Sequence, residues 1–409
     1  MGLHRFKPTP SGRMGVLWTL STVKDAAVVE FGCMGHMLYS GVTLKHAAVY
    51  DGCHLISTHI DETDISLGHT DRLLHTVENV IKSYQPKVIF LTPSSIPEVI
   101  GTDLKAAKLE LEMAFPSVKF VTFGSGGFNV TLKKGVEQTL LTLAREMPKP
   151  MIQKVEKSYN LIGSCADIFR FHEDAREIKR LMEGTFGMKP NCVMTSETSV
   201  EDLEGLGRAQ INIVIRHEGV KAAEALQNQF ETPFVVGRPY GIKGTVRFLE
   251  TVASELGVAI NQNFIEEERK RVFSQLLPIM PKMKHLVRMH PDEGTLTLGG
   301  HVDVVKGILN YGVEEFSLKR GECWCDDPAI IEGDVIFYDE LKWSQIVKAH
   351  QKGVFMGSGE ALTWKGMNLD NQIANPDVKW RLHSNNPPFV GFYGAVHLAE
   401  IWINSTEEA

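Results

Sequence analysis

One loop of the sequence places a thiol and an imidazole close together. Cys33 and His36 are three residues apart in the segment 31–36, which follows a run of apolar, β-forming residues. A thiolate and an imidazole in a glycine-containing loop could bind iron or copper. A single cysteine cannot hold an iron–sulfur cluster, so further ligands would have to come from elsewhere. The residues alone also allow Cys33 to be a structural residue at the end of a strand.

Other sequence motifs give weaker signals. The glycine turns 124–127 and 357–359 could hold phosphate at a helix start, but neither completes a nucleotide-binding pattern, so we predict no nucleotide binding by this chain. Cys323 and Cys325 form the only close cysteine pair, and two further metal ligands are not evident in the nearby sequence. We expect the other three cysteines to pack as small hydrophobic residues. They are Cys53, Cys165 and Cys192.

The elements that must position these loops alternate between short apolar runs and amphipathic segments. This alternation is typical of βαβ units with buried parallel strands, so we predict the α/β class. Expected strands are 26–31, 87–91, 119–123, 159–162, 192–194, 211–215, 234–236, 295–298, 315–318, 334–338, 354–356 and 389–391. Ligands gather beyond the carboxyl ends of parallel strands, so chemistry is expected in the loops that follow them.

Polar linkers divide these elements into three sets of similar size. We predict three Rossmann-like domains with parallel sheets around a central cleft, over residues 1–150, 151–275 and 276–409. The first would carry the loop with Cys33. A polar segment around 147–157 marks the first boundary, and a charged helix near 266–271 precedes the second.

Composition narrows the class of protein. The 409 residues are 43% hydrophobic and 23% charged, which is typical of globular chains. A net charge of −7 offers no basic footprint for nucleic acid, so we expect no nucleic-acid partner. Six cysteines in so long a chain favour a reducing compartment, and we expect a cytoplasmic location. No apolar run reaches the roughly 18 residues of a membrane span, so none is expected.

Several segments, taken in order, resemble motifs of the nitrogenase component 1 superfamily. The resemblance spans nearly the whole chain. It is carried by segments 14–18, 23–26, 31–36, 93–104, 160–163, 355–359 and 387–395.

The resemblance implies a mode of action. Members of this superfamily pair two homologous subunits with an iron–sulfur cluster at their interface, and a separate ATP-hydrolysing iron protein delivers the electrons. ATP would therefore be bound only by that partner. A larger iron–sulfur cofactor would belong to the homologous partner subunit if one is present.

The chain departs from the superfamily pattern at the cluster ligands. Counting along the motifs places the first and third cluster cysteines of the superfamily at Ser11 and Ser95, and the second at His36, with Cys33 three residues earlier. The chain therefore resembles partner subunits that give one ligand to a 4Fe-4S cluster. Counting favours His36 as that ligand, whereas donor softness favours Cys33, and we predict Cys33.

The resemblance also implies residues in the cleft. Arg216 lies roughly where the catalytic subunit has a cofactor-binding cysteine, His217 follows it, and His383 resembles the context of the cofactor-binding histidine. We predict that these three side chains handle an anionic or proton-accepting substrate or cofactor. In the alternative interpretation, His383 hydrogen-bonds to the backbone and Arg216 pairs with an acid such as Glu218.

The leading functional hypothesis is a subunit of a nitrogenase-like two-component reductase. Related systems reduce tetrapyrroles or cleave carbon–sulfur bonds, as in methylthio-alkane reductase. The first alternative is a subunit of a cofactor-assembly scaffold, which holds a cluster without turning over a substrate. The second is a metabolite-binding α/β protein in which the loop of Cys33 is structural.

Overall fold

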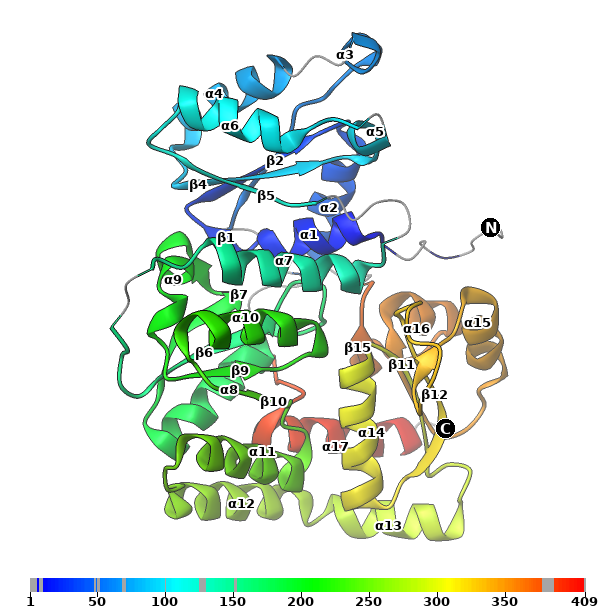
Figure 1. The fold of residues 1–409 in the computed structure, drawn as a ribbon. Coiled ribbons are helices and arrows are strands. Elements are labelled where there is room, and N and C mark those ends of the chain that lie inside the picture. The colour runs from blue at the N-terminus through cyan, green and yellow to red at the C-terminus, as the bar shows by residue number, and fades with distance from the viewer. Residues whose placement is uncertain are drawn as a thin grey trace.

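A computed structural model describes residue 6 and residues 10–47, 49, 52–67, 71–99, 101–124, 130–150, 153–376 and 386–407. The chain is α/β, as predicted, with three larger parallel sheets that lie in separate parts of the molecule (Figure 1). Their strands fall within residues 26–122, 158–236 and 295–374.

The first sheet has the strand order β3-β2-β4-β5, with all neighbours parallel. Its strands are β2 (Ala26–Phe31), β3 (His54–Ser57), β4 (Val88–Pro93) and β5 (Lys119–Thr122). Its helices are α2 (Gly35–His46), α3 (Glu62–Leu67), α4 (Asp71–Tyr84), α5 (Ser95–Val99) and α6 (Leu104–Ala114). Every residue of β2 and β4 is buried, because helices α4 and α6 cover one face and α1 and α7 cover the other (Figure 1).

Helices α1 (Gly12–Leu20) and α7 (Leu132–Glu146) lie between the first sheet and the rest of the molecule (Figure 1). Their backbones touch: a Cβ atom on Gly15 would lie 2.3 Å from the Leu132 carbonyl oxygen, and one on Gly135 would lie 1.9 Å from the Gly12 oxygen. Only glycine permits this approach. All nine residues of α1 are therefore buried, including a charged one, Arg13.

The second sheet has the order β10-β9-β6-β7 and is also parallel. Its strands are β6 (Ser158–Ser164), β7 (Lys189–Thr195), β9 (Ile211–Val214) and β10 (Phe234–Val236). Its helices are α8 (Phe171–Phe186), α9 (Val200–Glu204), α10 (Val220–Phe230), α11 (Gly241–Leu256) and α12 (Gln262–Leu276). A short parallel pair, β1 (Val23–Lys24) with β8 (Thr198–Ser199), joins the first part of the chain to this one.

The third sheet has the order β13-β12-β11-β14-β15. Its strands are β11 (Thr295–Gly300), β12 (Lys319–Cys325), β13 (Ile336–Phe337), β14 (Val354–Ser358) and β15 (Gln372–Ala374). Its helices are α13 (Ile279–Met289), α14 (Val302–Phe316), α15 (Glu340–Ala349) and α16 (Gly359–Lys365). The C-terminal helix α17 (Gly391–Glu407) then returns to pack against α8, α11 and α12, so it ties the third part to the second (Figure 1).

Two of the expected strands are wrong. Residues 315–318 end helix α14, whose last turn buries Phe316, and the strand begins only at Lys319. Residues 389 and 390 are buried but form a bend, and Gly391 starts α17. The segment 315–318 mixes polar and apolar residues and 389–391 has only three residues, so periodicity cannot distinguish a strand from a helix end in either.

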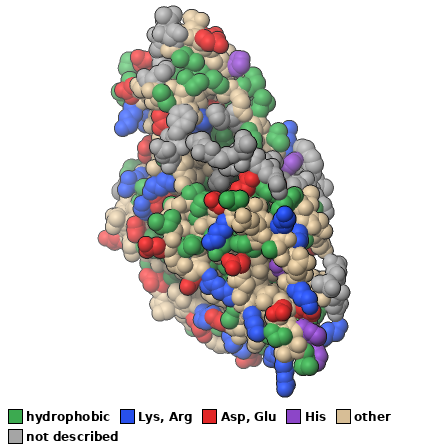
Figure 2. Space-filling model, turned by 90° about the vertical axis from the view of Figure 1, so that its right-hand side faces the viewer, with side chains coloured by type: hydrophobic (Ala, Val, Ile, Leu, Met, Phe, Trp, Pro, Cys, Tyr) green, Lys and Arg blue, Asp and Glu red, His purple; other side chains and the backbone are tan. Residues whose placement is uncertain are grey.

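None of the described helices is long and apolar enough to cross a membrane. Figure 2 shows one face of the molecule, on which acidic and basic side chains are interspersed and neither sign dominates.

Candidate functional site

Two loops meet at the carboxyl edge of the first sheet. Strands β2 and β4 are neighbours, and the Ser94 backbone N–H donates to the Phe31 carbonyl oxygen over 2.8 Å. A Cβ atom on Gly32 would lie 2.1 Å from the Cβ atom of Ser94, so the contact requires glycine. The next residue of each loop, Cys33 after β2 and Ser95 after β4, therefore lies at the same edge.

Arg13 reaches this edge from helix α1. Its Nη2 atom donates to the Ser95 hydroxyl over 2.8 Å, and its Nε atom lies 3.3 Å from an oxygen of Glu30 in β2. Burial lowers the pKa of Arg13, and the nearby Glu30, Glu98 and Cys33 oppose that shift. One guanidinium therefore contacts residues that are 17 and 82 positions away in the sequence.

The Glu30 carboxylate has an ion pair with Arg13 but few other polar contacts among the described residues. Its side chain is fully buried, yet neither oxygen accepts a hydrogen bond from any described residue. Burial raises the pKa of Glu30 to about 7, although Arg13 opposes the shift. A buried carboxylate with so few partners is costly to keep ionised.

The four expected ligand positions offer one thiol. Cys33 is half-buried, and its Sγ atom lies 4.0 Å from the Ile60 carbonyl oxygen. Ser11 is the N-cap of α1 and makes no side-chain capping bond. His36 lies in the first turn of α2, and its side chain is outside the described part of the structure. With Ser95 already bonded to Arg13, these donors fit one ligand to a shared iron–sulfur cluster and do not fit a complete set.

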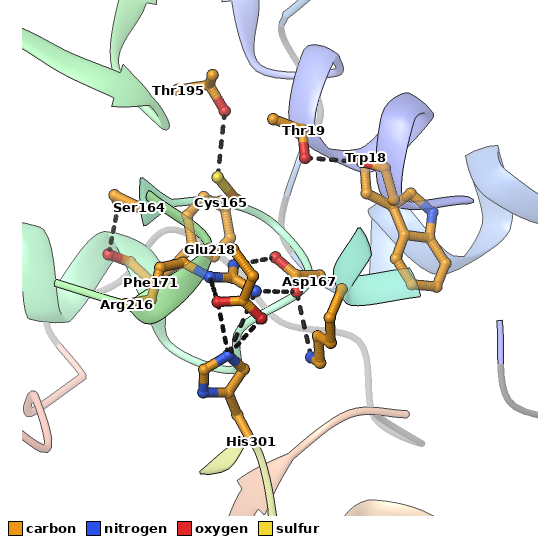
Figure 3. A network of polar contacts seen from close by, with 12 residues as sticks. Trp18, Thr19, Ser164, Cys165, Asp167, Phe171, Thr195, Arg216, Glu218 and His301 are labelled. Atoms are coloured by element: carbon orange, nitrogen blue, oxygen red, sulfur yellow. Dashed lines mark hydrogen bonds and ion pairs between the residues drawn. The ribbon is translucent and has the colours of Figure 1, made fainter. Parts of the chain in front are cut away.

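A second polar region lies between the second and third sheets and centres on Arg216 (Figure 3). Arg216 follows β9 and is 1% exposed. Its two terminal nitrogens donate to both oxygens of Asp167 over 2.6 and 2.9 Å, and its Nε atom donates to Glu218 over 2.8 Å. Lys133 of α7 lies 3.3 Å from both Asp167 and Asp326. All three nitrogens of the guanidinium thus contact acids of this chain, and Nη2 also lies 3.4 Å from His301 Nε2.

Two histidines and a further acid extend the network. The 3₁₀ turn His217–Gly219 begins with His217, whose Nδ1 atom lies 3.1 Å from an oxygen of Asp303 in α14. His301 caps α14: its Nδ1 atom accepts the Asp303 backbone N–H, and its Nε2 atom lies 3.1 and 3.2 Å from the two oxygens of Glu218. His301 points its ring at Glu218 in Figure 3. Glu218 and His301 are buried, whereas His217 and Asp303 reach solvent.

Charges rather than burial set the ionisation of these groups. Burial alone would raise the pKa of Asp167, but Arg216 and Lys133 lower it to about 2. The pKa of Asp303 is also about 2, because the hydrogen bond from His217 and the nearby imidazoles outweigh burial. Burial would lower the pKa of His217, but the bond to Asp303 and the charge of Glu218 raise it.

The structure thus brings Arg216 and His217 together and separates them from Cys33 and Ser95. His383 lies outside the described residues. The sequence analysis missed Arg13, Glu30, Asp167 and His301 as parts of these two regions. Asp167 and His301 each follow a strand, β6 and β11, so the rule that ligands gather at carboxyl ends could have identified them.

A cavity of about 220 Å³ adjoins this network between the first and third sheets. Asp167 and Asp326 contribute to its wall. Aromatic side chains make up much of the rest of the lining, among them Trp18, Tyr39, Trp324, Phe337, Tyr338 and Trp343.

Comparison with known proteins identifies the family and the fold. Residues 11–287 match the family model described as nitrogenase component 1 type oxidoreductase. The chain belongs to this family. The solved structure titled "Nitrogenase Cp1 at pH 6.5" superposes with a TM-score of 0.79 at 16% identity, covering 100% of this chain and 94% of that one. A likeness at this identity shows the shared fold.

The curated proteins to which this chain is similar include B subunits of light-independent protochlorophyllide reductase. The one from Leptolyngbya boryana is 24% identical, and the match covers 96% of this chain and 81% of that protein. The one from Pelodictyon phaeoclathratiforme is 27% identical over 48% of this chain, but that match spans only 36% of the relative's length. Both polar regions therefore lie within the fold of nitrogenase component 1 chains.

Proposed function

We propose that this chain is one subunit of a nitrogenase-like two-component reductase. It would pair with a homologous component 1 subunit and receive electrons, through an iron–sulfur cluster at their interface, from an ATP-hydrolysing iron protein. The observation that carries this proposal is the half-buried thiol of Cys33 at the same sheet edge as Ser95, two of the positions that the family resemblance assigns to the cluster. A cluster bound there would supply one-electron transfer.

The residues at that edge would divide the work. Cys33 gives the one soft donor, and the partner subunit completes the coordination, because hydroxyls such as those of Ser11 and Ser95 are poor ligands for iron–sulfur clusters. Arg13 holds the Ser95 loop and places a positive charge beside the cluster position, where it favours the reduced, more negative state. His36 is the alternative ligand that counting along the sequence favours.

We further propose a reaction of the tetrapyrrole-reducing type, which the names of the curated relatives support. The cavity of about 220 Å³ is smaller than the roughly 300–1,000 Å³ of common ligand pockets, so a tetrapyrrole would need the partner's surface to complete its site. Carbon–sulfur cleavage remains the alternative reaction. A cytoplasmic location fits these assignments.

Of the cleft residues, His217 and His383 keep their predicted roles in this proposal, whereas Arg216 pairs with Glu218, as the alternative interpretation expected. Arg216 is buried and paired, so it acts through Asp167 and Glu218 as a positioning residue. His217 reaches solvent, so we propose that it, rather than Arg216, contacts the substrate. The role of His383 is tested by a His383→Gln variant of the assembled complex, which should keep its cluster and lose reductive turnover.

The decisive experiment is anaerobic co-expression with the homologous subunit encoded nearest to this chain, followed by iron and sulfide analysis. The complex should contain iron and sulfide in cluster stoichiometry, and the chain purified alone should contain no cluster sulfide. Stoichiometric cluster binding by the monomer would contradict the proposal. A complex that holds a cluster but shows no reductive turnover with the iron protein and ATP would instead identify a cofactor-assembly scaffold.

A further inference from the structure

We propose that His217, Glu218, His301 and Asp303 form a binding site for one divalent transition-metal ion, such as Zn²⁺ or Fe²⁺. One ligand atom of each side chain can be chosen so that all four lie within 4.8 Å of one another. Two of these residues follow strand β9 and two follow strand β11. The ion would therefore connect the second sheet to the third, at a place that includes neither Cys33 nor any other cysteine.

The spacing of the ligand atoms suits a single small ion. Bonds of about 2.0–2.1 Å in a tetrahedral site separate neighbouring ligand atoms by about 3.3 Å. With Oε2 as the Glu218 ligand atom, His301 Nε2 lies 3.2 Å and His217 Nδ1 lies 3.5 Å from it, and His217 Nδ1 lies 3.1 Å from Asp303 Oδ2. The four ligand atoms lie within 4.8 Å of one another, so an ion among them would need side-chain rotations that bring the more distant pairs closer.

Neighbouring residues also hydrogen-bond to the proposed ligands, as is usual for metal-binding side chains. Arg216 fixes Glu218 through its Nε atom, and Asp167 in turn fixes Arg216 with two bonds. The Asp303 backbone N–H donates to Nδ1 of His301, so the proton of the neutral ring lies on Nε2 and points at Glu218. Arg216 Nη2 lies 3.4 Å from the same Nε2 atom. Binding of an ion at Nε2 would therefore move the ring proton to Nδ1 and break the bond from Asp303.

The charge of the region matches a divalent cation. Two basic side chains face four carboxylates, so with neutral imidazoles the cluster carries an excess of two negative charges. The groups counted are Arg216 and Lys133 against Asp167, Asp326, Glu218 and Asp303. Two imidazoles with two carboxylates and no thiolate favour Zn²⁺, Fe²⁺ or Mn²⁺ over soft Cu⁺.

Access to the site is provided on one side. Glu218 and His301 are buried, whereas the side chains of His217 and Asp303 are 42% and 30% exposed. An ion can therefore enter from solvent past the two outer ligands and be held by the two inner ones. The outer ligands are also the residues that can be changed with the least damage to the buried network.

The test is Zn²⁺ binding by the purified chain after chelator treatment, measured by competition with a chromophoric chelator. We expect one Zn²⁺ per chain and a rise in thermal midpoint when it binds. His217→Ala and Asp303→Asn should each weaken binding by at least about 100-fold, the upper end of what loss of a supporting residue costs. Circular dichroism would verify that both variants fold. Glu218→Gln is avoided because it also removes a partner of Arg216.

Two control variants separate this site from the cluster position. His285→Ala removes an exposed histidine on α13, and Cys33→Ala removes the proposed cluster ligand, so both should bind Zn²⁺ as the unmodified chain does. The outcome is independent of the reductase proposal, since no cluster or partner is needed. Absence of stoichiometric Zn²⁺ binding, or binding that survives both outer-ligand substitutions unchanged, would overturn the assignment.

Discussion

Buried acids make different numbers of hydrogen bonds at the edge of the first sheet and in the network around Arg216. At the edge, Glu30 is fully buried, and its two oxygens accept no hydrogen bond from the part of the chain that the structure describes. In the network, the Arg216 guanidinium meets two carboxylates over 2.6 to 2.9 Å, and those carboxylates are held in turn by Lys133 and His301.

The two regions differ in how fully a buried acid is compensated. Buried polar groups are normally hydrogen-bonded, because each unpaired one costs free energy. Asp167 and Glu218 satisfy this rule through their bonds to Arg216. Glu30 has an ion pair with Arg13 but accepts no hydrogen bond from a described residue, so its ionised form is less well stabilised.

The largest effect on stability should come from breaking the network. Asp167→Asn removes the charge that neutralises both Arg216 and Lys133 and leaves two buried cations short of a partner. Removal of one partner from a buried ion pair typically costs about 3–5 kcal/mol. We expect a loss of that size in the free energy of unfolding, measured by urea denaturation of the isolated chain.

A matched control for this prediction is the exposed pair of Arg247 and Glu314, whose side chains are 61% and 39% accessible. Glu314→Gln should change the free energy of unfolding by less than about 1 kcal/mol, because exposed ion pairs contribute little. Equal losses in the two variants would show that the network is no more important than a surface pair.

A smaller loss is expected at the sheet edge from Gly32→Ala. The new Cβ atom would lie 2.1 Å from the Cβ atom of Ser94, so one loop must move, and such overpacking typically costs about 1–3 kcal/mol. Gly35→Ala is the control in the same loop, since no atom lies within 4 Å of its added Cβ. Iron content of the assembled complex should fall only with Gly32→Ala. Indistinguishable variants would refute the close contact of the two loops.

Acid should weaken the network by an intermediate amount. The pKa of Asp167 in the folded chain is about 2, below its ordinary value of 3.8, so the ionised form is favoured by folding. Its contribution is complete above about pH 4 and is lost as the pH falls toward 2, an effect of about 2 kcal/mol. The free energy of unfolding should therefore drop more steeply over this range in the unmodified chain than in Asp167→Asn. Parallel pH profiles of the unmodified chain and Asp167→Asn would contradict this prediction.

Much of the architecture could be predicted from the sequence, because buried parallel strands are continuous apolar runs with turn residues after them. The strand predicted at 26–31 has those bounds in β2. The segment 315–318 was not predictable in the same way. Ser317 adopts a left-handed conformation that ends helix α14, and its neighbours Phe316 and Leu318 are buried at that end. Such a choice depends on tertiary packing, which a short run does not encode.

The candidate sites were less accessible to sequence reasoning. Cys33, Arg216 and His217 could be found because they follow apolar strands directly. Arg13 could not, because it lies within a buried helix and bonds to Ser95, which is 82 residues away in the sequence. The pairing of Glu218 with His301 likewise joins residues more than 80 positions apart, and no local pattern signals it.

The smallest effect on stability, and the sharpest test of the comparison, is expected from Cys33→Ala. The thiol is half-buried and its one polar contact is a 4.0 Å approach to the Ile60 oxygen, so its loss should change the free energy of unfolding by less than about 1 kcal/mol. The assembled complex should nevertheless lose its iron, because a thiolate is the normal donor to such clusters and the chain offers no other at this edge among its described residues. His36→Ala, assayed in the same complex, should retain its iron. If instead His36→Ala loses iron and Cys33→Ala keeps it, the ligand is the imidazole that counting along the sequence favours.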